Sequence, residues 1–111
     1  MLIGTRILHL RTGGARTDIP VQLFAPERGE DGGWFCRYTI GWPDEPRESE
    51  GWGFDALQPL LLTLQKIGAE IYASAYHESG RLVLDEPGRG YGFPVPPNGR
   101  DRLVGDDALY L

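Results

Sequence analysis

The sequence contains one cysteine, one lysine and two histidines, and it has no long uncharged apolar run. With Cys36 alone, neither an internal disulfide nor a cluster of thiolate metal ligands can form, and its aromatic neighbours indicate a buried thiol. The uncharged apolar run Ala56 to Gln65, which no other uncharged run exceeds, is far shorter than the ~20 residues that a transmembrane helix needs. Arg6, His9 and Arg11 interrupt the apolar start, which therefore does not resemble a signal peptide. These features predict a cytoplasmic protein with no membrane partner.

Positive charge is also scarce. Sixteen acidic residues outnumber eleven basic ones, which gives a formal net charge of -5 at pH 7. Such a chain repels a polyanion unless its arginines gather on one face, so we expect no nucleic-acid partner. The chain is rich instead in turn residues, with 16 glycines and 9 prolines among 111 residues. Because aromatic residues are interleaved with them, they indicate tight turns between buried elements of a single domain, residues 1–111.

Alternating apolar residues predict four antiparallel strands joined by short turns. The strongest pattern runs from Trp34 to Trp42, where every second residue is apolar and would face the core. The polar, glycine-bearing strand that follows it suits the edge of a sheet. The four predicted strands are Thr5–Arg11, Asp18–Ala25, Trp34–Trp42 and Arg47–Phe54.

One long helix is predicted after these strands. Asp55 is a good N-cap, Gln58 completes a variant of the capping box, and Pro59 is tolerated in the first turn. Apolar residues then recur at helical spacing to about Tyr76–His77. We expect this stripe to lie across the sheet, with Gly68 letting the helix and sheet backbones approach closely. The stripe comprises Leu57, Leu60, Leu61, Leu64, Ile67, Gly68, Ile71, Tyr72 and Ala75.

The helix carries a second, weaker apolar stripe, which must contact another surface. Either the C-terminal segment or a second subunit covers it, and the apolar stretches Arg81–Leu84 and Tyr91–Val95 favour the C-terminal segment. We therefore expect an α+β fold: a four- or five-stranded antiparallel sheet, one long helix packed across one face, and an irregular Gly/Pro-rich C-terminal segment. The second stripe comprises Pro59, Leu62, Ala69, Ala73 and Tyr76.

The stretch RGYGFPVP, from Arg89 to Pro96, begins like the RNA-binding signature of RRM domains. That signature continues along a central strand, and here two of its positions hold Pro94 and Pro96. Because proline donates no backbone hydrogen bond, the stretch cannot be such a strand. We expect instead that Tyr91 and Phe93 pack in the interior while the glycines turn the chain.

His77 precedes Asp85 and Glu86 by a few residues, and this group is the nearest approach to an acid–base cluster. A histidine beside carboxylates can transfer protons near neutral pH, but a histidine in the last helical turn also stabilises the helix dipole. The His and Cys positions fit no metal motif, and no serine has the context of a nucleophile. We predict no metal, no cofactor and no catalytic residue outside this alternative.

Trp34, Trp42 and Trp52 lie near the ends of predicted strands. Tryptophans at such places rim pockets and interfaces in some proteins, and in a domain this small they more often complete the core. Trp42 and Trp52 each neighbour a turn, so these two are the candidates for ligand contact.

Four stretches stand out in order along the chain: IGWP at 40–43, LQKIGAEIYASAYHESGRL at 64–82, EPGRGYGFPVP at 86–96 and LVGDD at 103–107. In these stretches the chain resembles a small family of uncharacterised bacterial proteins, a domain of unknown function, over about residues 5 to 107. The resemblance implies that GYGFP belongs to a shared structural pattern rather than to an RNA motif.

Taken together, these features favour a non-enzymatic binding module that acts through a protein partner or its own dimer. The acidic charge, the second helix stripe and the aromatic residues beside turns support this hypothesis. The alternative is a small-molecule enzyme or ligand-binding protein with its site between the helix C-terminus and the 85–93 loop. That site would use His77, Asp85, Glu86, Arg89 and Tyr91.

Overall fold

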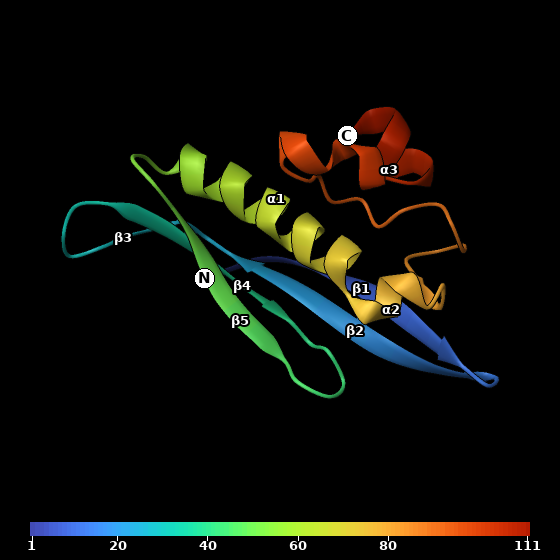
Figure 1. Cartoon of the computed structure of the whole chain (residues 1–111). Coiled ribbons are helices and arrows are strands. Elements are labelled where there is room, and N and C mark those ends of the chain that lie inside the picture. The colour runs from blue at the N-terminus through green and yellow to red at the C-terminus, as the bar shows by residue number, and fades with distance from the viewer.

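The computed structural model describes all residues, 1–111, and contains one antiparallel sheet crossed by one long helix (Figure 1). The C-terminal segment packs against that helix (Figure 1) and also contacts the sheet, where Arg6 donates to Gly92 O at 2.8 Å. The α+β fold expected from the sequence is therefore confirmed. The strands are β1 (Leu2–Thr12), β2 (Ala15–Phe24), β3 (Glu27–Arg28), β4 (Trp34–Ile40), β5 (Arg47–Gly53) and β6 (Leu82–Val83). The helices are α1 (Leu57–Ala73), α2 (Ala75–Glu78), the 3-10 helix η1 (Pro97–Arg102) and α3 (Gly105–Tyr110).

The four long strands form the predicted meander, in which each pairs with its neighbour along the chain. The two-residue β3 pairs with β4 on the same side as β2 does, and β6 pairs with β1 on the side opposite β2. β5 pairs with β4 alone and is an edge strand, as its composition indicated. The β1–β2 hairpin turns at Gly13 and Gly14, both with positive φ, which is the conformation that a two-residue turn between twisted strands requires.

The alternation in β4 divides the sheet into two faces. Cys36, Tyr38 and Ile40 are fully buried beneath the helix. Phe35 and Arg37 lie on the opposite face, which no other layer covers (Figure 1). Burial of a large apolar side chain stabilises a fold by about 1.5–3 kcal/mol, so the covered face supplies the main driving force for this sheet.

The start of α1 follows the predicted capping pattern. Asp55 Oδ1 accepts hydrogen bonds from the backbone N–H groups of Leu57 at 3.1 Å and Gln58 at 2.8 Å. Gln58 Oε1 in turn accepts from the backbone N–H of Phe54 at 2.8 Å. The two bonds to Asp55 satisfy donors that the first helical turn leaves without intrahelical partners, and the bond from Phe54 ties the preceding residue to that turn.

The face that α1 turns to the sheet differs from the prediction. Pro59 and Thr63 are buried against β5, whereas Leu57 and Leu61 are 73% and 56% exposed. The cause lies in the sheet: a Cβ atom at Gly51 would lie 2.4 Å from Thr63 Oγ1. The small strand residues admit small helix residues at close range, and this close approach rotates the leucines of the first two turns outward.

The role of Gly68 was also predicted wrongly. A Cβ atom at this position would lie 1.8 Å from the carbonyl oxygen of Pro94, so the glycine admits the C-terminal segment and not the sheet. Val95 and Leu103 of that segment are buried in the same cluster as Tyr72 of α1. The C-terminal segment therefore covers the second half of the helix.

The long helix ends three residues earlier than predicted. Ser74 has an extended backbone, with φ -74 and ψ 150, and it separates α1 from the short α2. Its hydroxyl donates to Ile71 O at 2.6 Å and accepts from the backbone N–H of His77 at 3.2 Å. Ser74 thus ends one helix and caps the next. Gly80, with φ +75, turns the chain towards β6.

The stretch RGYGFPVP packs as predicted. Tyr91, Phe93 and Val95 are each at most 6% exposed and belong to the hydrophobic core. Gly90 and Gly92 have positive φ, a conformation that glycine adopts without steric cost. The stretch therefore anchors the C-terminal segment on the helix.

Candidate functional site

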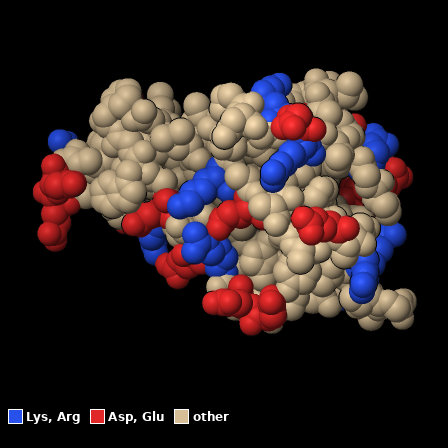
Figure 2. Space-filling view, in the orientation of Figure 1, with Lys and Arg blue, Asp and Glu red and all other residues tan.

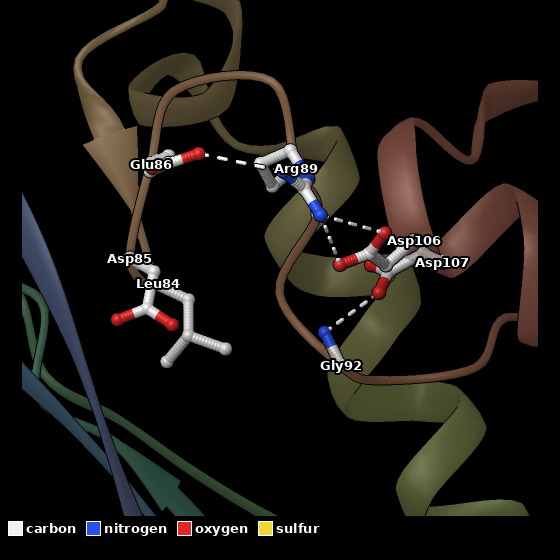
Figure 3. Close-up of a pocket in the computed structure, with 8 residues that line it drawn as sticks. Leu84, Asp85, Glu86, Arg89, Gly92, Asp106 and Asp107 are labelled. Carbon is white, nitrogen blue, oxygen red and sulfur yellow. Dashed lines mark hydrogen bonds and ion pairs between the residues drawn. The ribbon is translucent and has the colours of Figure 1, made fainter.

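A pocket of about 500 Å³ lies between the loop after β6 and the start of α3 (Figure 3). Its lining is mostly charged and includes three residues of the predicted alternative site, Asp85, Glu86 and Arg89. Asp106 and Asp107 complete the charged part from α3. The Asp85 carboxylate points away from Arg89 (Figure 3). The pocket thus presents acidic groups from both sides of the gap.

Arg89 joins the two sides of this pocket. Its guanidinium lies 3.4 Å from Glu86 Oε2 and 3.2 Å from Asp106 Oδ2. All three side chains are about half exposed or more, so each pair contributes at most about 1 kcal/mol to stability. Arg89 is therefore available to a ligand at little cost to the fold.

His77 and Tyr91 lie together, as the alternative hypothesis requires. His77 Nδ1 lies 2.5 Å from the hydroxyl of Tyr91. Burial and the nearby Asp107 carboxylate raise the pKa of Tyr91 to about 12, which keeps the hydroxyl protonated at neutral pH. The pair therefore forms a structural contact between α2 and the C-terminal segment, and nothing in it activates the tyrosine as a base.

The five residues of the alternative site are divided between two pockets. His77 and Tyr91 line a second, smaller pocket of about 150 Å³, whereas Asp85 and Arg89 line the larger one. Glu86 lines both. The structure thus places the groups near one another without directing them at a common point.

The carboxylate of Asp107, a residue that is 2% exposed, was not predicted as a site residue from the sequence. Its oxygens accept three hydrogen bonds: from the Tyr72 hydroxyl at 2.7 Å, from the Tyr91 N–H at 2.8 Å and from the Gly92 N–H at 2.7 Å. We call this group the Asp107 network. A Cβ atom at Gly90 would lie 2.5 Å from the carboxyl carbon, so the glycine makes room for it.

The Asp107 network connects α1, the GYGFP stretch and α3. Burial and the hydrogen bond to Asp107 raise the pKa of Tyr72, so this hydroxyl also stays protonated and remains a donor. The bonds from the Tyr72 hydroxyl and the Tyr91 N–H are buried, and the bond from the Gly92 N–H is partly buried; together they stabilise the buried charge. Asp107 belongs to the LVGDD stretch, but nothing in the sequence distinguished the buried aspartate of this stretch from its half-exposed neighbour Asp106.

The two tryptophans proposed for ligand contact each pack on another aromatic ring. Trp42 stacks on Tyr76, with ring centroids 4.8 Å apart and planes at 12°. Trp52 is 47% exposed on the uncovered face of the sheet and packs on Phe35, with centroids 4.9 Å apart. Neither ring lines any of the pockets described here.

A second candidate site is apolar. A groove of about 530 Å³ runs along the first half of α1, and another of about 460 Å³ lies beside the start of β1. Leu64 lines both grooves, so they form one continuous region that we call the apolar surface. Figure 2 shows this uncharged area over the first half of α1, with charged side chains gathered below it and over the C-terminal segment. We define the apolar surface by Ile3, Phe54, Leu57, Leu60, Leu61 and Leu64.

No helix of the structure is long and apolar enough to span a membrane. No group of three or more His, Cys, Asp or Glu side chains is arranged to hold a metal ion.

The fold and these contacts define a small two-layer α+β domain with a C-terminal segment fixed by a buried carboxylate. The chain belongs to the family described as Domain of unknown function (DUF6968), whose model matches residues 4–95. The matched residues include IGWP and GYGFP, whereas LVGDD lies beyond them. No curated protein and no solved structure matches the chain.

Proposed function

We propose that this chain is a non-enzymatic bacterial interaction module of the cytoplasm, which binds a protein partner or a second copy of itself through the apolar surface. The observation that carries the proposal is the exposure of large apolar side chains along the first half of α1. Leu57 is 73% exposed, Leu61 56% and Phe54 78%.

The composition of this surface supports contact with protein. Monomeric proteins rarely leave large contiguous apolar patches in water, and such patches mark interaction sites. Ala56 to Gln65 has no charged side chain, so no ion pair would have to be desolvated when a partner covers it. The C-terminal segment covers only the second half of the helix, at Gly68 and beyond.

The proposal is tested with a charged double variant, Leu57→Glu with Leu61→Glu. Both side chains are exposed, so the fold should be kept, while a partner would have to bury two carboxylates. The matched control is Leu109→Glu on α3, where the leucine is 74% exposed and lies outside the apolar surface. Circular dichroism checks that all variants fold.

The measurement combines light scattering with capture from a bacterial lysate, followed by mass spectrometry. We expect the native chain and the Leu109→Glu control to self-associate or to retain the same defined protein. The double variant should lose that species. A native chain that is monomeric and captures nothing, or a double variant that binds as the native chain does, contradicts the proposal.

A ligand-binding role of the charged pocket is the second candidate, because Asp85, Glu86 and Arg89 gather around its 500 Å³. A cationic or zwitterionic small molecule would match this lining. Thermal shifts with a panel of such compounds test it, with Asp85→Asn plus Glu86→Gln as the site variant. Glu78→Gln, on exposed α2, is the control. A shift that survives in the site variant argues against this pocket.

A further inference from the structure

The groove beside the start of β1 opens onto the covered face of the sheet. Val21 and Leu23 of β2 lie opposite Arg6 and Gly4 of β1, and residues opposite each other in an antiparallel pair share one face. Leu64 of α1 also lines the groove. Its volume of about 460 Å³ falls within the range of about 300–1,000 Å³ that is usual for small-molecule sites. The groove is therefore large enough to hold a small molecule against an apolar floor.

Gly4 keeps this groove open. A Cβ atom at Gly4 would meet no atom within 4 Å, and its φ is not positive, so a larger residue could stand there without strain. Gly51 and Gly68 differ, because a Cβ atom at either position would collide with neighbouring protein atoms. The space beside Gly4 is thus not taken up by the protein itself.

Arg6 is held at the groove by the C-terminal segment. Its Nη1 donates to the carbonyl oxygens of Gly92 at 2.8 Å and Tyr91 at 3.4 Å. Its guanidinium carbon lies 4.8 Å from the centroid of the Phe93 ring. A Cβ atom at Gly92 would lie 2.7 Å from Nη1, so the glycine makes room for the guanidinium. A cation fixed in this way loses little further freedom when it binds a ligand.

The Arg6 guanidinium keeps donors for a ligand. Both of its hydrogen bonds come from Nη1, and none of the six ion pairs of the structure includes Arg6. Nε and Nη2 therefore have no acceptor in the protein, and the side chain is exposed, so a ligand can reach them. The N–H groups of these two nitrogens form a fork that matches the two oxygens of a carboxylate. Arg6 thus offers a bidentate anion site at an apolar groove.

We propose that this groove binds a small carboxylate with an unbranched apolar tail. The carboxylate pairs with Nε and Nη2 of Arg6, and the tail lies against Leu23 and Leu64. A purely polar anion would pair with Arg6 but leave the apolar floor uncovered, and a cationic amphiphile would meet a like charge. The inference goes beyond the proposed function, because Leu57 and Leu61 do not line this groove.

The first test varies the tail. Hexanoate, octanoate and decanoate are titrated into isotope-labelled protein, and the amide signals are followed by NMR. Octanoate should bind with a dissociation constant of about 1 mM or below. It should shift the amides of Thr5, Leu64 and Gly92, which line the groove, and not that of Thr17 near the other end of the β1–β2 hairpin. Each added methylene should tighten binding about fourfold until the groove is full.

The second test separates the head group from the tail. Octan-1-ol has the same tail as octanoate and no charge. Arg6→Gln should weaken octanoate binding at least about tenfold and octan-1-ol binding by less than about twofold, because only the carboxylate loses charged donors. The control Arg16→Gln removes the same charge from an exposed arginine of β2 and should leave both affinities within about twofold. An arginine that only held the C-terminal segment would change both affinities alike.

The third test fills the groove and leaves Arg6 in place. Gly4→Val adds a β-branched side chain in open space on a strand, so the variant should fold. It should weaken octanoate and octan-1-ol binding at least about tenfold, because both tails lose the same space. The control Thr17→Val, at an exposed position of β2, should bind both as the native chain does. If Arg6→Gln fails to fold, Gly4→Val and the tail series still decide.

Three results overturn the inference: no saturable shift with octanoate up to about 10 mM, a Gly4→Val variant that binds octanoate as tightly as the native chain, or an Arg6→Gln variant that weakens octan-1-ol as much as octanoate. The proposed function is tested separately. Leu57→Glu with Leu61→Glu should abolish partner binding and leave the octanoate affinity within about threefold. Lysate capture without octanoate binding refutes this inference alone.

Discussion

Replacing Asp107 with asparagine should unfold this protein far more readily than replacing its neighbour Asp106. The Asp107 carboxylate accepts from three donors, the hydroxyl of Tyr72 and the backbone N–H groups of Tyr91 and Gly92, at 2.7 to 2.8 Å. Asparagine offers one oxygen and one NH₂ group. Whichever way its amide turns, the NH₂ group faces at least one of those donors.

The size of the effect follows from the number of bonds lost. A hydrogen bond to a charged group contributes about 1.5–3 kcal/mol, and a buried donor without a partner costs a similar amount. In the better orientation the NH₂ group faces the partly buried Gly92 N–H and one bond to a charged group is lost, so Asp107→Asn should reduce the free energy of unfolding by about 1.5–3 kcal/mol. For a domain whose total stability is about 5–15 kcal/mol, that is a large fraction.

Urea unfolding followed by tryptophan fluorescence measures this loss, and Asp106→Asn is the matched control. Asp106 is half exposed and pairs with Arg89 alone, so its replacement should cost at most about 1 kcal/mol. Hydrogen exchange adds a local measurement: the amides of Tyr91 and Gly92 should exchange faster in Asp107→Asn. If Asp107→Asn costs less than about 1 kcal/mol, or no more than Asp106→Asn, the network does not hold the C-terminal segment.

Two further perturbations test the packing and the buried tyrosines. Helix propensity alone would make Gly68→Ala more stable by about 1 kcal/mol. Because the new Cβ atom would lie 1.8 Å from Pro94 O, the variant should instead lose about 1–3 kcal/mol of unfolding free energy. The control is Gly99→Ala, whose Cβ atom would lie 3.6 Å from Val95 and whose stability should change by less than about 0.5 kcal/mol. A stabilised Gly68→Ala in thermal unfolding would show that the segment does not lie against the helix. Burial, together with a hydrogen bond to Glu70, raises the pKa of Tyr38 to about 12, and Tyr91 reaches the same value. Both folded pKa values lie above the usual value of about 10, so each protonated tyrosine stabilises the folded state fully below about pH 10. Between about pH 10 and 12 the free energy of unfolding should fall by about 1.4 kcal/mol per pH unit for each tyrosine. Tyr38→Phe should flatten the slope by one tyrosine's share, and an unchanged slope would refute the assignment.

The four-stranded sheet and the start of α1 could be predicted from the sequence because their signals are local, although β1 and β2 each begin three residues earlier than predicted. The alternation from Trp34 to Ile40 lies within one strand, and the Asp55 cap lies within four residues of the groups that it bonds. The rotation of α1 was not predictable from its own residues. It depends on Gly51, a residue of another element, which admits Thr63 where the pattern favoured leucine.

The candidate site was predictable only in part. His77 and Tyr91 were named as neighbours and do meet, at 2.5 Å. The carboxylate that organises the loop was missed, because its donors are 15, 16 and 35 residues away and include two backbone groups that any residue type would provide. Exposure was also hidden from the sequence. Leu57 and Leu61 fit the stripe as well as Ile67 does, although Ile67 is fully buried.

The Asp107 network also has a consequence for the order of folding. Strands β1 to β5 pair with near neighbours in sequence, and α1 packs on the strands that directly precede it. The sheet and the helix can therefore form as the chain emerges from the ribosome. The side of the second half of α1 that the C-terminal segment covers then stays exposed to water until residue 107 has been synthesised. During synthesis the protein therefore passes through a stage in which both halves of α1 are exposed, and a chaperone that binds apolar helices would find its target there.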